Sequence, residues 1–130
     1  MPMTAAVLIV ACTLWHECRG EPAEGQRAVA SVIANRARAR HTTPDAECLR
    51  AWQFSCWNGG RTLADMIPSH AKRRTPAWLR CLTLAWDVCG GRFEATGPWD
   101  HYCRWDCWPK WRAAATRTDR IGAHVFMVVP

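Results

Sequence analysis

The amino-acid sequence predicts a mainly helical α+β domain with a small β element. Three segments, near residues 4–19, 22–40 and 75–90, carry apolar residues at the spacing of one helix face. After Gly97 the pattern becomes irregular and β-like, and the β-branched run from Val125 to Val129 indicates a strand. We expect one domain over residues 1–130, because this length allows a chain to bury about two-thirds of its unfolded surface.

The first predicted helix has an N-cap candidate in Thr4 and a C-terminal stop in Gly20. Its apolar run from Ala5 to Trp15 is much shorter than the about 20 residues that span a bilayer. The run also lacks the basic start and small-residue cleavage site of a signal peptide. We therefore predict a core helix and no stable membrane association. The residues expected on its buried flank are Val7, Leu8, Ala11, Leu14, Trp15 and Cys18.

Prolines mark the first turns of the other two long helices, at Pro22 and Pro76. Between these helices we expect a short helical turn over residues 43–52, and irregular surface that can include a short helix over 58–74. The second helix is predicted to bury Ala28, Val29, Val32 and Ile33 and to expose Arg27, Arg36, Arg38 and Arg40. The third is predicted to bury Trp78, Leu79, Leu82, Ala85, Trp86 and Cys89.

The net charge of +6 and the pI near 9.1 favour an anionic partner, such as nucleic acid, acidic lipid or a bacterial envelope polymer. No zinc-finger, RNP or helix-turn-helix signature accompanies the charge, so we expect no nucleic-acid partner.

Eight cysteines are many for a chain of this length. They form no zinc-ligand pattern, and we expect no metal and no cofactor. An even number fits disulfides formed in an oxidising compartment, and we expect at least two bridges between different elements. The alternative is that several cysteines are small buried hydrophobic residues.

Glu17 is the candidate catalytic acid. It falls in the last turn of the first predicted helix, where the negative end of the helix dipole disfavours a second negative charge. Partial burial by Trp15 acts in the same direction and favours the protonated form that a general acid requires. Arg19 opposes this effect. The alternative is a solvated glutamate at a helix end.

Four blocks of the sequence follow one another in the order of a known family: residues 15–36, 53–57, 96–102 and 121–126. The chain resembles the SleB-like cell-wall hydrolases, the family of the spore cortex-lytic enzymes, from about residue 5 to 127. The resemblance implies a lysozyme- and lytic-transglycosylase-like fold and a peptidoglycan substrate. It also implies that Glu17 is the catalytic glutamate.

Lytic transglycosylases work with one carboxylate, so the resemblance predicts cleavage of the MurNAc–GlcNAc bond with 1,6-anhydro-muramoyl products. Glu17 would serve as general acid and then as general base. A hydrolytic muramidase or glucosaminidase, or a non-enzymatic, disulfide-stapled basic binding module, are the alternatives. A hydrolase uses a second carboxylate, and no residue of the sequence stands out as that carboxylate. The nominal candidates are Glu21, Glu24, Asp100 and Asp106, of which the first two are expected to cap and charge the second helix.

Substrate-binding residues are predicted in two of the blocks. Gln53 and Ser55 can hydrogen-bond sugar groups, and the Trp57 indole can stack on a sugar ring. His101 and Tyr102 match the family's His-Tyr pair and are expected to bind substrate or to steady Glu17. Phe54 and Cys56 are expected in the core, and His124 as a buried, hydrogen-bonded support.

Nine tryptophans exceed the needs of a small core. Trp15, Trp78 and Trp86 are expected in the core. Trp99, Trp105, Trp108 and Trp111 are expected either to line a glycan groove or to form a satellite cluster. The chain departs from the family pattern at Cys18, at Pro98-Trp99 and at Cys103.

Without a recognisable signal or wall-binding module, the sequence favours a monomeric bacteriophage endolysin, made in the host cytoplasm and released to the wall by a holin. A bacterial enzyme that acts in the periplasm or outside the cell is the alternative.

Overall fold

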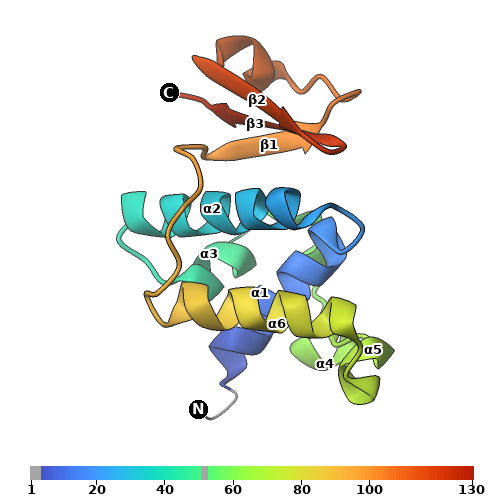
Figure 1. Ribbon diagram of the computed structural model, residues 1–130. Coiled ribbons are helices and arrows are strands. Elements are labelled where there is room, and N and C mark those ends of the chain that lie inside the picture. Colours follow the sequence, from blue (N-terminus) through green and yellow to red (C-terminus); the bar gives the residue numbers. More distant parts are fainter. Residues whose placement is uncertain (1–3, 51–52) are drawn as a thin grey trace.

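The computed structural model describes residues 4–50 and 53–130 and consists of a helical body with a small sheet at one end (Figure 1). The body contains α1 (Ala5–Cys18), α2 (Ala23–Ala39), α3 (Pro44–Leu49), η1 (Ser55–Trp57), α4 (Leu63–Met66), α5 (Ser69–Arg73) and α6 (Pro76–Cys89). The sheet region contains β1 (His101–Arg104), η2 (Lys110–Ala114), β2 (Arg117–Ile121) and β3 (His124–Val128). This architecture confirms the mainly helical α+β class.

Helix α1 is the central helix of the body and packs against α2, α3 and α6. The Thr4 hydroxyl accepts a hydrogen bond from the Val7 amide, as an N-cap does. Val10, Ala11 and Leu14 are fully buried, which confirms a core helix. Within residues 4–50 and 53–130, no helix has the combination of length and apolarity that crossing a bilayer demands.

Helices α2 and α6 pack against α1 through their apolar faces. Helix α2 buries the four predicted apolar residues, but Arg36 is not part of a solvated face. The Arg36 Nε donates to the Asp100 carbonyl oxygen at 2.6 Å, and burial lowers the pKa of this guanidinium. In α6 the buried stripe runs through Trp78, Cys81, Ala85 and Val88. The expected burial of Leu79 is therefore wrong, because the stripe is turned by about one residue towards Cys81.

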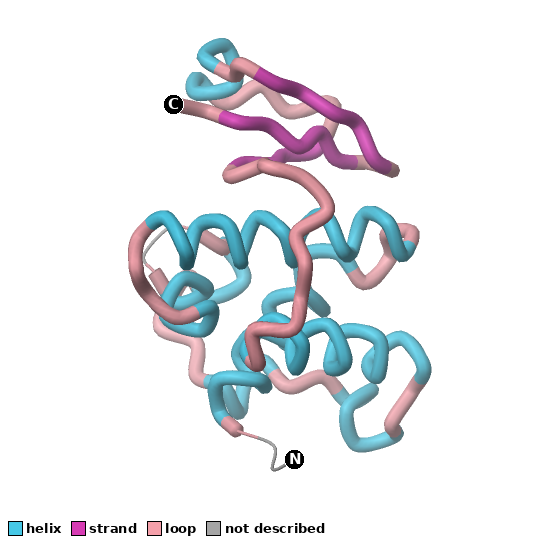
Figure 2. The backbone as a smooth tube through the Cα atoms, turned by 60° about the vertical axis from the view of Figure 1, so that its left-hand side comes forward, coloured by secondary structure: helices cyan, strands magenta, loops and turns pink. Residues whose placement is uncertain are grey.

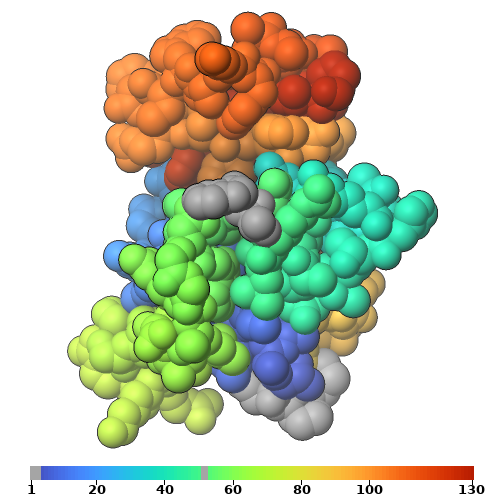
Figure 3. All heavy atoms as spheres, turned by 180° about the vertical axis from the view of Figure 1, so that it is seen from behind, coloured from blue at the N-terminus to red at the C-terminus, as the bar shows by residue number. Residues whose placement is uncertain are grey.

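The sheet is antiparallel with the order β1-β3-β2, so the apolar strand β3 lies in the centre. Phe126 of β3 is fully buried and pairs with Tyr102 on β1. The sheet covers the side of α2 that faces away from α1 and α6 (Figure 1). Seen from behind, it forms one end of the molecule, next to the green segment that contains η1 (Figure 3).

The chain between α6 and β1 passes alongside the helical body to reach the sheet (Figure 2). Two side chains of α2 hold this connection. Asn35 donates to the carbonyl oxygens of Gly97 and Trp99 at 3.0 and 2.8 Å, and the Ser31 hydroxyl accepts from the Thr96 amide. Trp99 itself is buried and donates to Asp119 on β2, so it belongs to the core and does not line a glycan groove.

All eight cysteines lie in the described part of the chain and carry free thiols. The predicted disulfides are therefore not supported by this structure, and the alternative of small buried hydrophobic residues fits five of the eight. Burial raises the pKa of the Cys12 thiol to about 12 and that of Cys81 to about 11. Thiols of this kind stay protonated at neutral pH and pack as apolar groups.

Candidate active site

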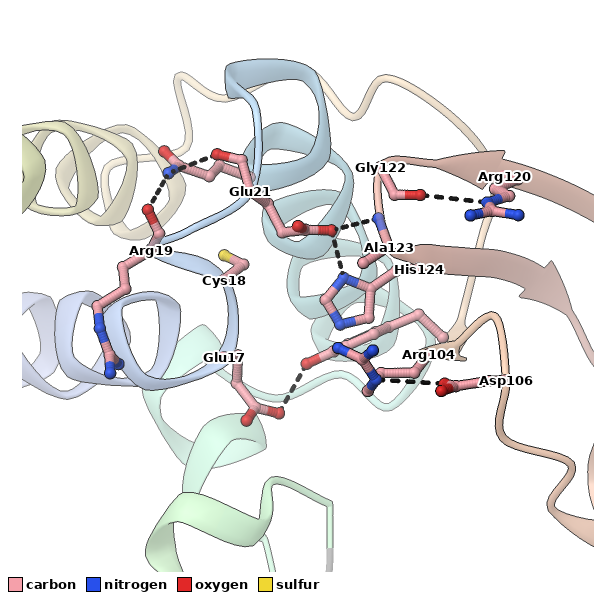
Figure 4. Close-up of polar contacts among 12 residues, drawn as sticks. Glu17, Cys18, Arg19, Glu21, Arg104, Asp106, Arg120, Gly122, Ala123 and His124 are labelled. Carbon is pink, nitrogen blue, oxygen red and sulfur yellow. Dashed lines mark hydrogen bonds and ion pairs between the residues drawn. The ribbon is translucent and has the colours of Figure 1, made fainter.

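Glu17 is the penultimate residue of α1 and is half-buried, at the end of the body that meets the sheet (Figure 4). The Tyr102 hydroxyl of β1 donates a hydrogen bond to the Glu17 Oε1 at 2.7 Å. Burial and the adjacent Glu17 carboxylate raise the pKa of Tyr102 well above 10, so the phenol keeps its proton. Tyr102 thus steadies one carboxylate oxygen of Glu17, one of the two roles expected for it.

Tyr102 is itself fixed by aromatic neighbours from β3. Its ring stacks on Phe126 with the centroids 5.6 Å apart, and the His124 ring meets it edge-on at 5.4 Å. The Arg36 contact to Asp100, two residues before Tyr102, fixes the start of β1 against α2. The orientation of Glu17 therefore depends on a phenol that the core of the sheet holds in place.

Glu21 joins the α1–α2 connection to the turn between β2 and β3 (Figure 4). Its Oε1 accepts from the Ala123 amide and pairs with the His124 Nδ1, both at 2.9 Å. The turn passes so close that a Cβ on Gly122, whose φ is +60°, would lie 2.8 Å from this oxygen. The expectation that Glu21 caps α2 is wrong, because its carboxylate is directed to the sheet. His124 is nearly buried and hydrogen-bonded, as expected.

The other candidates for a second acid have separate roles. Glu24 is exposed in the first turn of α2, as expected. Asp100 accepts from the Val129 amide and pairs with the His101 Nδ1, while Asp106 pairs with Arg104 at the surface. Within residues 4–50 and 53–130, the one hydrogen bond recorded for the Glu17 carboxylate comes from Tyr102.

The block around η1 adjoins the end of α1. The Trp57 indole donates to the Thr13 hydroxyl at 2.8 Å, and Phe54 and Cys56 are buried, as expected. Burial, and then the nearby charge of Glu17, raise the pKa of the Cys56 thiol to about 12, which places the block next to the acid. Two further residues of the block reach the surface, Ser55 fully and Gln53 in part.

His101 is separated from Tyr102 although the two are adjacent in sequence, because successive residues of a strand point to opposite faces. The His101 ring packs against Trp111 of η2 with the centroids 4.8 Å apart, and its Nδ1 lies 2.9 Å from Asp100. The structure thus brings Tyr102 to Glu17 and directs His101 towards η2.

A hollow of about 520 Å³ lies elsewhere, between α2 and α6. Its lining includes Gln26, Leu79 and Asp87 and none of the predicted site residues. Because this hollow holds none of the predicted site residues, we place the candidate active site at Glu17, on the chemistry of its side-chain contacts.

A half-buried carboxylate held by a partly buried, protonated phenol is an arrangement suited to general acid–base catalysis. Residues 20–127 match the model of a family described as Cell Wall Hydrolase, and the chain belongs to this family. It is accordingly a peptidoglycan-degrading enzyme. The matched range begins three residues after Glu17, so the role of Glu17 rests on its geometry and on the motif around it. Comparisons with curated proteins and with solved structures gave no match.

Sequence reasoning missed two elements of the site: the Glu21–His124 pair and the Asn35 and Arg36 contacts that position β1. Their signal was present, because all four residues lie within the blocks shared with the cell-wall hydrolases. What the blocks do not show is which residues from different blocks come into contact.

Proposed function

We propose that this enzyme is a lytic transglycosylase that cleaves the MurNAc–GlcNAc bond of peptidoglycan with Glu17 as its acid and base. The observation that carries the proposal is the contact between Glu17 and Tyr102, together with the engagement of Glu21, Asp100 and Asp106 in contacts of their own. A site built on one carboxylate fits a reaction that does not require a second one to activate water.

The reaction begins with protonated Glu17. Its proton passes to the glycosidic oxygen as the bond from that oxygen to C1 of MurNAc breaks, and positive charge develops on the sugar. The Glu17 carboxylate then takes the proton of the 6-hydroxyl of the same sugar, whose oxygen bonds to C1. The products are a 1,6-anhydro-muramoyl end and a free GlcNAc hydroxyl, and Glu17 is again protonated. Because the attacking hydroxyl belongs to the same sugar, proximity favours this step over attack by water.

The phenol of Tyr102 supports both half-reactions in this proposal. It occupies Oε1 and so leaves Oε2 as the oxygen that gives and takes the proton. A hydrogen bond to the charged form also stabilises the carboxylate that remains after the first proton transfer. Because Tyr102 stays protonated, this donor is present throughout the cycle.

Substrate contacts are proposed for residues close to Glu17 and for His101. Ser55 and Gln53 reach the surface in the block next to the acid and can hydrogen-bond hydroxyl and acetamido groups. Trp57 keeps its indole N–H on Thr13, so its ring is fixed and its remaining exposed surface can stack on a sugar. His101, on the other face of β1, would contact the glycan further from the cleaved bond.

We further propose that the enzyme is a monomer that reaches the wall as a phage endolysin, through a membrane opened by a holin. The basic charge would favour binding to the anionic wall. Expression in the bacterial cytoplasm should leave cells intact until the inner membrane is permeabilised. Lysis without permeabilisation would instead indicate export by the cell.

Product analysis tests the reaction. Purified peptidoglycan is digested and the muropeptides are measured by mass spectrometry, with Glu17→Gln as the inactive control. We expect products that lack one water relative to reducing muramic-acid ends. Reducing muramic-acid ends as the main product would show a muramidase, and reducing glucosamine ends a glucosaminidase.

A further inference from the structure

Two exposed tryptophans lie on the loop that follows β1. Trp105 is 46% exposed and Trp108 is 75% exposed, which is unusual because folding generally buries most of a tryptophan side chain. Each indole lies against a guanidinium: Arg120 is 4.9 Å from the Trp105 ring centroid, and Arg112 is 3.5 Å from that of Trp108. We call Trp105, Trp108, Arg112 and Arg120 the aromatic–arginine surface.

The aromatic–arginine surface is held in place by the backbone. The Trp105 amide donates to the Ala123 carbonyl at 3.0 Å, which ties the loop to the turn between β2 and β3. The Arg112 Nη1 donates to the carbonyl oxygens of Trp105 and Cys107. Both indoles are therefore presented to solvent from an ordered loop, which lowers the entropic cost of binding a partner.

This surface adjoins the candidate active site. The Trp105 amide donates to the Ala123 carbonyl oxygen, and the Ala123 amide donates in turn to the Glu21 carboxylate, four residues after Glu17. Figure 4 shows Arg104 and Asp106, which flank Trp105, beside His124 on the sheet side of Glu17. A linear polymer that occupies the site at Glu17 can thus continue onto the aromatic–arginine surface.

The charge of this region is strongly positive. Residues 101–121 contain five basic and two acidic residues, a net charge of +3 out of the chain's +6. The two acidic residues pair with Arg104 and Arg117. Across residues 4–50 and 53–130, no ion pair is recorded for Lys110, Arg112 or Arg120, which leaves three cations for a ligand.

We propose that the aromatic–arginine surface is a second glycan-binding site, which takes a sugar strand that carries carboxylates, here the peptidoglycan strand with its stem peptides. The free indole faces stack on sugar rings, and the guanidinium groups and Lys110 bind the carboxylates. The choice of peptidoglycan rests on the proposed function, because the strand must extend from Glu17. Nucleic acid also stacks on aromatic rings beside cations, and the test below separates the two.

The test measures binding of the full chain with Glu17→Gln, which leaves the strand uncut, to insoluble peptidoglycan freed of secondary polymers. In this background Trp105→Ala with Trp108→Ala should weaken binding about tenfold, as the loss of two stacking contacts predicts. The matched control is Leu49→Ala on α3, which truncates an apolar residue of similar exposure, 47%, and should leave binding unchanged. Both substituted indoles are exposed, and thermal unfolding verifies that the variants fold.

Removing the stem peptides with an amidase should weaken binding of the Glu17→Gln chain and reduce its salt dependence. Unchanged binding of the double tryptophan variant would overturn the proposal. So would binding of single-stranded DNA that is tighter than binding of peptidoglycan and is lost in that variant. If the wild-type enzyme cleaves peptidoglycan but the double tryptophan variant binds it as tightly as the Glu17→Gln chain does, only the second binding site is refuted. If binding depends on the two tryptophans but the wild-type enzyme cleaves nothing, only the proposed function is refuted.

Discussion

The helical body and the sheet contribute to the site in different ways. The body supplies Glu17 from the end of α1, a helix whose central residues are fully buried. The sheet supplies Tyr102 from β1, a strand with no fully buried residue, and polar contacts from Asn35, Arg36 and Glu21 hold it to the body. The acid thus has a rigid support, while its partner depends on the docking of the sheet. Substitutions between the sheet and the helical body should therefore show which contacts hold the sheet in place and which ones act in catalysis.

Loss of the Glu21 carboxylate should have the largest effect on docking. Glu21→Ala leaves the Ala123 amide and the His124 Nδ1 without their acceptor, and each was bonded at 2.9 Å. We expect the free energy of unfolding to fall by about 2 kcal/mol. Chemical denaturation measures it, and Glu24→Ala, a truncation of an exposed carboxylate in the adjacent first turn of α2, is the control. Equal stability of the two variants would show that this pair does not hold the sheet.

Tyr102→Phe should have a moderate effect on catalysis and alter its pH dependence. The variant keeps the ring between Phe126 and His124 but removes the donor to Glu17. We expect a rate loss of about tenfold, the value of one hydrogen bond to a charged group. Removing the donor withdraws a hydrogen bond that stabilises the charged carboxylate, so the pH–rate profile should differ from that of the wild type. A profile identical to that of the wild type would mean that Tyr102 does not act through Glu17.

The buried thiols should have a smaller effect, a loss of folding stability at high pH. Cys12 and Cys81 have pKa values of about 12 and 11 in the fold, against an ordinary value of 9.0. The unfolded chain therefore releases protons that the folded chain retains. The stabilisation is fully present below pH 9 and should be lost as the pH rises through 11 to 12.

Denaturation curves between pH 8 and 11 test this, since Cys12→Ala with Cys81→Ala should flatten the decline in stability with pH. Val10→Ala, which truncates the same core without removing a titratable group, should lower stability and keep the slope. Alkylation after denaturation then counts the thiols. Eight would agree with the structure, whereas four or fewer would establish the disulfides that the sequence predicts and remove this effect.

The sequence predicted the body far better than the sheet, for physical reasons. The three long helices begin and end within about two residues of the predicted positions, because Thr4, Thr75 and the two prolines are local signals. Strands β1 and β2 were described only as irregular and β-like, because their residues are mostly exposed or half-buried and lack a clear alternation. Their pairing with β3 is set by contacts that no local pattern contains.

The site shows the same division. Glu17 could be singled out because its place at a helix end and the motif around it are local. The partnership of Glu21 with His124 joins residues 103 positions apart, so the sequence suggested a local capping role for Glu21 instead. His101 and Tyr102 were treated as a pair, and the strand geometry separates them.

The central claim is that Glu17, held by Tyr102, is the catalytic acid. Its most direct test is the clearing of purified peptidoglycan by folded Glu17→Gln, with Glu21→Gln as the matched control on the neighbouring carboxylate. We predict that Glu17→Gln keeps the wild-type unfolding temperature and loses activity by about 10³-fold, within the range for a general acid. Glu21→Gln should keep most of the activity at temperatures where it is folded. Clearing by Glu17→Gln at a rate near that of the wild type would contradict the claim.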